Sequence, residues 1–311
     1  METNLSPIRA ERKKYGKRRS GSLSPIIIVL FIVLILYTVS LFIPMLWALG
    51  ASLKDQSEFR LNPLGIPNGW FWTWEWNNYV KAFELFYMPL NTLNGVKYVF
   101  IDQMFLNALL YSVGCAFTAT LVSCVTAYLC AKFKYALSKV MYTIVIVVMV
   151  LPIVGNTPAA LQLNRMLNIY DTIWGMWIMK ANFLGMYFLV FHATFESLPN
   201  DFAEAAYVDG ASEMRVLTQI MLPLVKGAFF TILLLNFIAL WNDYQTPMLY
   251  IPSHPTIAYG MFYFSNSTTN ETNSVPLRMT GCFLMMLPIL VLFSVFHKRL
   301  IGNVSLGGLK E

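Results

Sequence analysis

Six long runs of apolar residues constrain this chain more than any other feature of its sequence. They cover residues 26–49, 105–131, 140–161, 172–195, 227–251 and 279–297. A helix that crosses a bilayer needs about 20 mostly apolar residues, and each run approaches or exceeds that length. Because 57% of the 311 residues are hydrophobic and only 12% are charged, we expect an all-α polytopic membrane protein with six transmembrane helices.

Three of these runs are interrupted by residues that disfavour a simple span. The third contains Pro152 and Pro158, the fourth contains Lys180 and Asn182, and the fifth ends in a polar stretch. The first run is longer than the roughly 7–15 apolar residues of a signal peptide, so we interpret it as an uncleaved helix. A proline inside a span removes a backbone hydrogen bond and predicts a kink in the third helix.

The basic residues predict the orientation of the bundle. With the N-terminus inside, 15 of the 22 lysines and arginines fall in cytoplasmic segments and six fall outside. This bias places both termini in the cytoplasm of a bacterial cell, with the bundle in the plasma membrane. We therefore divide the chain into a basic N-terminal arm (1–25), a six-helix transmembrane domain (26–297) and a C-terminal tail (298–311). The basic residues near the N-terminus are a topology signal next to the first span, and we expect no nucleic-acid binding.

Motifs for catalysis are missing from the sequence. The only Gly-Lys pair, Gly16-Lys17, is followed by Arg18, whereas a phosphate-binding loop ends in Gly-Lys-Ser/Thr. The three histidines are far apart, and the four cysteines fall inside apolar runs, so we expect no metal site and no disulfide. We therefore expect a protein that is not itself an enzyme.

One cytoplasmic segment, residues 199–223, departs from the apolar pattern. Pro199 and Asn200 form a helix-start signal with Asn200 or Asp201 as the N-cap, and the carboxylates of Asp201 and Glu204 then favour the helix dipole. Gly210 permits the positive φ that ends a helix. The segment predicts a short helix, a sharp turn and a second helix that leads to Pro223. On these grounds alone it could be an ordinary amphipathic connector.

The same segment carries a motif at fixed spacing. It reads Glu-Ala-Ala, three residues, Gly, nine residues, Ile, one residue, Leu-Pro, and it is formed by Glu204, Ala205, Ala206, Gly210, Ile220, Leu222 and Pro223. This motif resembles the signature loop of ABC-type importer permeases, and other segments resemble the carbohydrate-uptake, MalG-like branch. Those segments are residues 62–65 and 78–83, the stretch 241–244 with Pro247, and the tail 302–310.

The resemblance implies a type I ABC importer permease fold, similar to MetI, and a set of partners. It implies a second permease subunit, two ATP-binding subunits and an extracellular solute-binding protein, with ATP and Mg²⁺ bound by the ATPase and no cofactor on this chain. The loop 199–223 would be the coupling helix that enters a cleft of the ATPase. Its predicted coupling residues are Asp201, Glu204, Ala205, Ala206, Asp209, Gly210, Ile220 and Pro223. The cargo implied is a sugar or an oligosaccharide.

Polar residues inside the spans are candidates for the translocation path, because such residues usually face the bundle interior or water. Asn107, Tyr111 and Thr118 share one face of the second span with Gly114, and they could line a pore or form interhelical hydrogen bonds. A second stripe of small residues on this span, which includes Ser123, predicts close helix packing. The other candidates are Asn156 between the two prolines, and Asn236, Trp241, Asn242 and Asp243 in the fifth span, with Lys180 as a possible partner of Asp243.

Several alternatives remain open on the sequence. Trp70, Trp72, Trp74 and Trp76 alternate in the first external segment, which favours an aromatic belt at the membrane surface or a surface for docking or sugar stacking. The cargo could be another solute, such as a peptide or an amino acid. The chain could also be an ion-coupled secondary transporter, although it lacks the internal repeat typical of many such proteins, or a membrane-embedded enzyme.

Overall fold

The structure is a computed structural model, and it describes residues 25–92, 95–133, 135–151, 155–266 and 274–304. Three helices are long and apolar enough to cross a membrane. They are α2 (Pro25–Ser52), α5 (Ile101–Lys132) and α16 (Val275–Val304), of which residues 275–294 meet this criterion. The first, second and sixth predicted spans are therefore confirmed as helices. The arm before Pro25, Pro152 and the tail beyond Val304 lie outside the described residues.

Helix α5 is the centre of the bundle, where it packs against α8 (Ile173–Lys180), α9 (Met186–Glu196) and α13 (Lys226–Trp241). Two apolar clusters lie along it. One contains Tyr111 and Trp241, and the other contains Tyr128 and Phe195. Buried side chains thus join α5 to three other helices along most of its length.

The third, fourth and fifth predicted spans are each broken into two helices. The third becomes α6 (Ala136–Val150) and α7 (Thr157–Met166), with Pro158 in the first turn of α7. The fourth becomes α8 and α9, separated at residues 181–185, and the fifth becomes α13 and α14 (Gln245–Tyr250), separated at residues 242–244. The hydropathy windows extend across these breaks because the residues around them are apolar. Continuous helices are therefore the wrong description of these three segments.

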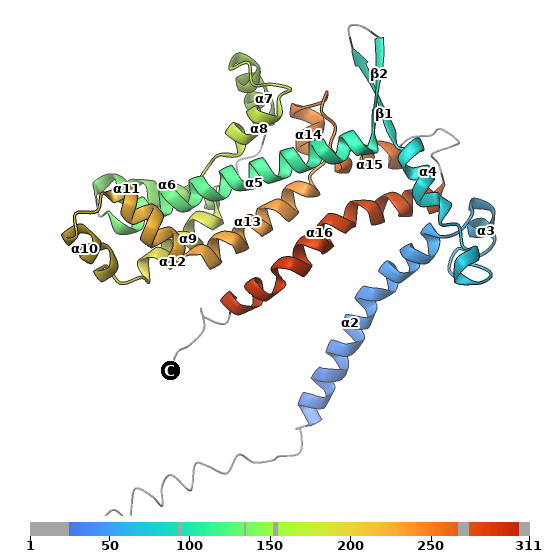
Figure 1. Cartoon of the computed structure of the whole chain (residues 1–311), viewed down its shortest axis with the longest axis horizontal. Helices are drawn as coiled ribbons and strands as arrows, with labels where there is room; N and C mark the ends of the chain where they lie inside the picture. The colour runs from blue at the N-terminus through green and yellow to red at the C-terminus, as the bar shows by residue number, and fades with distance from the viewer. Residues whose placement is uncertain (1–24, 93–94, 134, 152–154, 267–273, 305–311) are drawn as a thin grey trace, which may run out of the picture.

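The segment between α2 and α5 folds into a compact extension. It contains α3 (Gln56–Leu61), a 3-10 turn η1 (Phe71–Thr73), α4 (Asn77–Leu85) and the strands β1 (Tyr87–Thr92) and β2 (Gly95–Phe100). The strands pair antiparallel with Tyr87 opposite Phe100 and form a hairpin that projects from the bundle (Figure 1). This hairpin departs from the all-α expectation. Alternating aromatic and aliphatic residues in β2 favour a strand, and Val99 and Met88 are buried at the hairpin base.

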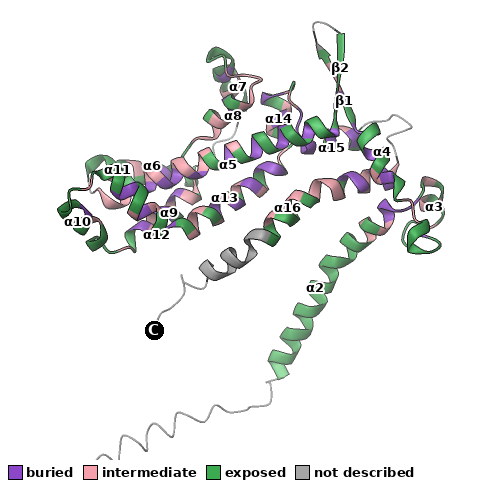
Figure 2. Ribbon diagram, viewed as in Figure 1, coloured by how far each residue is buried: buried purple, intermediate pink, exposed green. Residues whose placement is uncertain are grey.

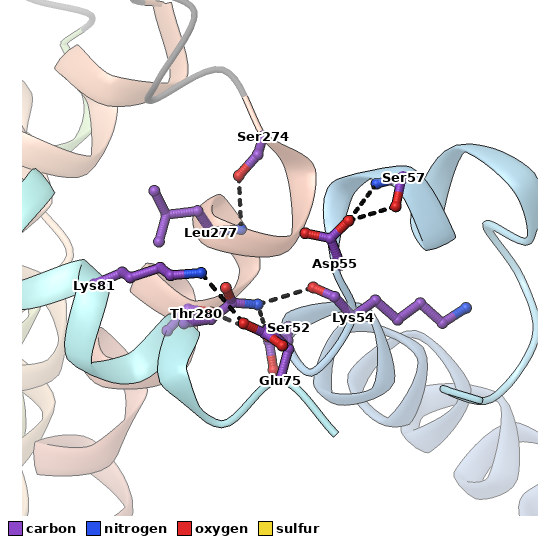
Figure 3. A network of polar contacts seen from close by, with 10 residues as sticks. Ser52, Lys54, Asp55, Ser57, Glu75, Lys81, Ser274, Leu277 and Thr280 are labelled. Atoms are coloured by element: carbon purple, nitrogen blue, oxygen red, sulfur yellow. Dashed lines mark hydrogen bonds and ion pairs between the residues drawn. The ribbon is translucent and has the colours of Figure 1, made fainter. Parts of the chain in front are cut away.

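A buried polar junction ties this extension to α2 and α16 (Figure 3). The side-chain amide of Asn78 donates to the backbone oxygens of Ser52 and Lys54, each at 2.9 Å. The hydroxyl of Thr280 in α16 donates to the same Ser52 oxygen at 3.4 Å. These contacts satisfy the carbonyl groups that the end of α2 leaves free, and they fix α2 to the bundle at that end.

The rest of α2 diverges from the bundle, and its spanning part is exposed along its length (Figure 2). Helix α10 (Asp201–Val208) lies at the left end of the molecule in Figure 1, α16 runs toward that side, and the first turn of α2 lies below the bundle. The hairpin, α3 and α4 lie toward the other end. The remaining helix, α15 (Ile257–Asn266), packs against α5 and α16 near the hairpin.

Candidate functional site

The loop 199–223 forms two helical pieces joined by a turn at Gly210. Helix α10 covers Asp201–Val208, and Gly210 has φ +79°, which confirms the predicted left-handed turn. The second piece begins with α11 (Glu213–Val216), where the Ser212 hydroxyl accepts from the Arg215 amide at 3.4 Å. The helix start at Asp201 is as predicted, but the side chain of Asn200 does not cap α10.

Asn200 instead receives a hydrogen bond from Lys132 at the end of α5. The Lys132 ammonium donates to the Asn200 side-chain oxygen at 2.9 Å and to the Leu198 backbone oxygen at 2.7 Å. On the other side of the loop, Ala206 and Val216 pack into the same buried cluster as Tyr128 and Phe195. The loop is therefore fixed to the helix bundle by both polar and apolar contacts.

The two adjacent alanines of the motif have different environments. Ala206 is buried against the bundle, whereas Ala205 is exposed together with Glu204. Successive side chains on an α-helix point about 100° apart, so the two alanines face different directions. Only the exposed alanine, Ala205, can contact a partner. The exposed surface also includes Asp201 and Asp209, and no ion pair involves the loop's carboxylates within the described part of the chain.

The second half of the loop leads into the membrane through a sharp bend. A π-helical stretch, η2 (Leu217–Met221), contains the half-buried Ile220, and α12 (Leu222–Leu224) contains the exposed Pro223. The segment 213–224 then meets α13 at an angle of 77°. A displacement of the loop along its own axis would therefore act across the direction of α13.

A second group of predicted residues gathers around Asp243, in the break between α13 and α14. The Tyr111 hydroxyl donates to one carboxylate oxygen of Asp243 at 3.2 Å, and the Thr246 amide donates to the other at 3.0 Å. A carboxylate inside a membrane protein is costly unless its oxygens have partners, and these two donors supply them. Tyr111 and Asp243, which are far apart in sequence, are thus brought together.

A cavity of about 330 Å³ lies beside this carboxylate. Asp243, Asn236 and Lys180 line it, together with Ser123 of α5 and the chain at residues 182–185. Asn236 also donates to the Thr120 hydroxyl at 3.0 Å. Lys180 and Asp243 share the cavity, but they form no direct ion pair among the residues that the structure describes. The cavity walls therefore contain the amine of Lys180, the carboxylate of Asp243 and the side-chain amides of Asn182 and Asn236.

The other predicted path residues lie elsewhere and make other contacts. Asn107 is buried and donates to the Pro255 oxygen, and Thr118 donates to the Trp177 oxygen of α8. Asn156 is exposed in the break before α7. The buried Trp241 donates to the Met285 oxygen of α16, and Asn242 donates to its own helix. Of the two interpretations for the stripe on α5, these contacts favour interhelical hydrogen bonding at Asn107 and Thr118.

Sequence reasoning did not identify the residues that anchor or complete these two sites. In the sequence, Lys132 is one of the basic residues that predict the orientation of the bundle, and Ser123 belongs to the stripe of small residues that predicts helix packing. Gly114 is another example, since a β-carbon there would lie 2.1 Å from the Trp177 indole nitrogen. Each of these roles depends on a contact between residues about 60 positions apart, for which the sequence carries no local signal.

Three relatives of this chain are permeases for saccharides. It is 27% identical over 279 residues to the diacetylchitobiose uptake permease NgcG of Streptomyces coelicolor. That alignment covers 88% of this chain and 86% of NgcG. It is 26% identical to the maltodextrin permease MdxG of Bacillus subtilis, with 74% and 84% covered. The trehalose permease SugB of Mycobacterium tuberculosis is 23% identical, with 86% and 92% covered.

The fold is shared with a solved structure of a bacterial ABC transporter that imports the acidic polysaccharide alginate. The TM-score is 0.70 at 20% identity, and the match covers 87% of this chain and 95% of the other. The sequence model of the family described as binding-protein-dependent transport system inner membrane component matches residues 119–305. Since that match spans more than half of the chain and includes the loop 199–223 and Asp243, this protein belongs to the binding-protein-dependent transport system inner membrane components.

Proposed function

We propose that this chain is a transmembrane subunit of an ATP-driven ABC importer for a sugar or an oligosaccharide. The observation that carries the proposal is the exposed loop 199–223, which is anchored to the bundle and presents a short helix at one end of the molecule. Relatives described as permeases for diacetylchitobiose, maltodextrin and trehalose support the cargo class. ATP and Mg²⁺ bind a partner ATPase, and this chain binds no cofactor.

Helix α10 transmits the movement of the ATPase to the membrane helices. Glu204 is exposed and has no ion-pair partner in the described part of the chain, so it can contact a basic group of the ATPase. Val208, which is 88% exposed, adds an apolar contact at the tip of α10. When the ATPase subunits close on ATP, the anchors at Lys132 and Ala206 carry the displacement of α10 into α5 and α13.

The chain crosses the membrane six times, with both termini in the cytoplasm. The two pieces of each broken run, α6 with α7, α8 with α9, and α13 with α14, count as one crossing each. Two features support this topology. The first turn of α2 and the end of α16 both lie away from the end of the molecule that holds α3 and α4 (Figure 1). Basic residues are in excess in the segments that this topology assigns to the cytoplasm. The hairpin, α3 and α4 are then extracellular and near the solute-binding protein.

A second permease subunit packs on the exposed membrane surface of this chain. The spanning part of α2 has no buried residue, and an apolar groove of about 900 Å³ runs between α5, α13 and α16. Phe105, Phe117, Phe230 and Leu287 line this groove. Helices of a partner permease fit between α2 and the groove, which would make the transport unit a heterodimer with two ATPase subunits below it.

The loop proposal is tested by a photocrosslinking side chain placed at Val208 in the assembled transporter. We expect a crosslink to the ATPase from Val208, and none from the control position Lys97 in the hairpin at the opposite end. A loop that crosslinks to no other polypeptide would overturn the coupling role.

Uptake into proteoliposomes tests the energy source and the cargo class. We expect labelled oligosaccharide to accumulate only when ATP, the ATPase and the solute-binding protein are all present. Uptake that persists without the ATPase and follows an ion gradient would favour the secondary-transporter alternative. A binding protein that binds amino acids or peptides, and not saccharides, would retain the importer and change its cargo.

A further inference from the structure

The extracellular segment contains an exposed apolar surface that the transport function does not use. No charged residue occurs between Arg60 and Glu75. Six large apolar side chains in this interval are exposed, with fractions from 58% to 89%, and we call them the apolar platform. The platform consists of Leu61, Leu64, Ile66, Trp70, Phe71 and Trp72.

The platform belongs to an ordered loop with many hydrogen bonds. The ammonium of the buried Lys54 donates to the backbone oxygens of Asn62 and Gly65, at 2.5 and 2.7 Å. In Figure 3 the Lys54 side chain points away from Glu75, and it forms no ion pair in the described chain. The Gly65 amide donates to the Asn62 side chain at 2.8 Å. The apolar side chains are therefore held outward by the loop fold itself.

The loop lies beside the last turns of α2, which fixes its height relative to the membrane. The Trp47 indole of α2 donates to the Pro63 oxygen at 2.8 Å, and a β-carbon on Gly50 would lie 3.7 Å from the Pro67 ring. From Ile26, the first apolar residue after the basic arm, to Trp47 the helix rises about 32 Å, and the hydrocarbon core is about 30 Å thick. Trp47 and the attached loop therefore lie at the outer boundary of the hydrocarbon.

Two polar side chains near the platform are used within the loop. The Thr73 hydroxyl donates to the Trp70 oxygen at 2.7 Å, and the Trp76 indole donates to the Phe71 oxygen at 2.9 Å. Trp70 and Trp72 stack on each other, with ring centroids 5.4 Å apart and 3° between their planes. A saccharide site combines an aromatic face with hydrogen-bonding side chains, and an acidic or basic protein partner needs charge. The six platform side chains carry no charge, and their only polar groups are the indole nitrogens of Trp70 and Trp72.

We propose that the apolar platform inserts into the outer leaflet of the bilayer and anchors the extracellular extension to the membrane surface. Tryptophan is enriched at this depth, and an exposed apolar surface next to a span is stabilised by the boundary between headgroups and acyl chains. The anchor holds the end of α2 and α4 at a fixed height above the bundle. It depends on α2 crossing the membrane and not on the identity of the cargo.

The test measures how deep platform side chains lie in the full assembled transporter in lipid nanodiscs. A nitroxide label is placed at Leu64→Cys or Trp72→Cys, with Lys97→Cys in the hairpin as the aqueous control, in a background free of other reactive cysteines. Collisions with oxygen, which partitions into lipid, and with a water-soluble nickel complex are compared by electron paramagnetic resonance. We expect the oxygen-to-nickel ratio at both platform positions to exceed that at Lys97 several-fold.

Three results would overturn the anchor. In the first, the platform labels contact nickel as readily as the Lys97 label does. In the second, the labels lose nickel contact only after the solute-binding protein or an oligosaccharide is added, which would indicate docking or sugar stacking. In the third, both reagents are excluded because a neighbouring subunit covers the loop. Since the replaced side chains are 81% and 72% exposed, the variants should fold, and their assembly is checked by size-exclusion chromatography.

Discussion

Replacing Gly210 with valine tests whether the turn between α10 and α11 couples the loop to transport. Gly210 has φ +79°, and nothing lies within 4 Å of the position that a β-carbon would occupy. A β-carbon at this position therefore creates no clash, and its cost arises from the backbone conformation. A residue with a β-carbon is disfavoured in this conformation by about 1–2 kcal/mol, and a β-branched residue is especially rare there.

This cost is enough to change the turn without unfolding the protein. A difference of about 1–2 kcal/mol changes an equilibrium by a factor of roughly 5–30, whereas a typical domain is stable by about 5–15 kcal/mol. We therefore expect Gly210→Val to assemble with its partners at least in part. The orientation of α10 relative to α11 should be lost in most molecules, and ATP-driven uptake should fall by roughly 5- to 30-fold.

The assay compares uptake and ATP hydrolysis in proteoliposomes for three variants. Gly210→Asn is the matched control, because asparagine adopts positive φ more readily than other residues with a β-carbon. We expect it to retain most of the transport, Gly210→Ala to lose more and Gly210→Val to lose the most. Wild-type uptake in Gly210→Val would refute the coupling role of the turn. An equal loss in the asparagine and valine variants would refute the backbone explanation.

Three further substitutions test contacts on which the description of the sites depends. Lys132→Met removes hydrogen bonds from a charged donor, worth about 1.5–3 kcal/mol each, so amide exchange across residues 199–209 should accelerate. Tyr111→Phe removes one donor to Asp243 and should lower Tm in detergent by an amount equivalent to about 1–3 kcal/mol; an unchanged Tm would mean that this bond is not formed. Asp55 caps α3, and hydrogen bonds from the Ser57 hydroxyl and amide hold its pKa below the usual value. The capping stabilisation is therefore complete above the unfolded pKa of about 3.9 and is lost as the pH falls through the lower folded value, so the Tm difference between wild type and Asp55→Ala should persist at about pH 5 and vanish in stronger acid.

The long spans and the turn in the loop 199–223 could be predicted because their signals are local. Apolar composition over about 20 or more residues identifies α2, α5 and α16, and Gly210 is recognised by its place after a short helix. The hairpin could not be predicted in the same way, because its local signal is weak. Its strand signal, the alternation in residues 96–100, occupies only one strand of the pair.

The broken spans and the polar contacts depend on tertiary structure. Hydropathy averages over a window, so Lys180 and Asn242 lower the mean without showing where the helix ends. The Tyr111 hydroxyl and the Asp243 carboxylate are brought together only by the packing of α5 against α13. Likewise, the burial of Ala206 but not Ala205 is decided by which face of α10 meets Tyr128 and Phe195, which no spacing rule within the loop can specify.

The breaks in the fourth and fifth spans occur where polar backbone can be tolerated. In hydrocarbon, backbone groups outside a helix must be buried in protein or line a water-filled space. The break at residues 181–185 and the residue Asp243 in the break at 242–244 both line the cavity of about 330 Å³. The Ser123 hydroxyl donates to the Asn182 oxygen at 3.3 Å, and the Thr246 amide donates to Asp243, so protein groups satisfy part of this backbone and carboxylate. We infer that water fills the rest of the cavity. This cavity is therefore the place in the bundle where both interrupted helices can be accommodated.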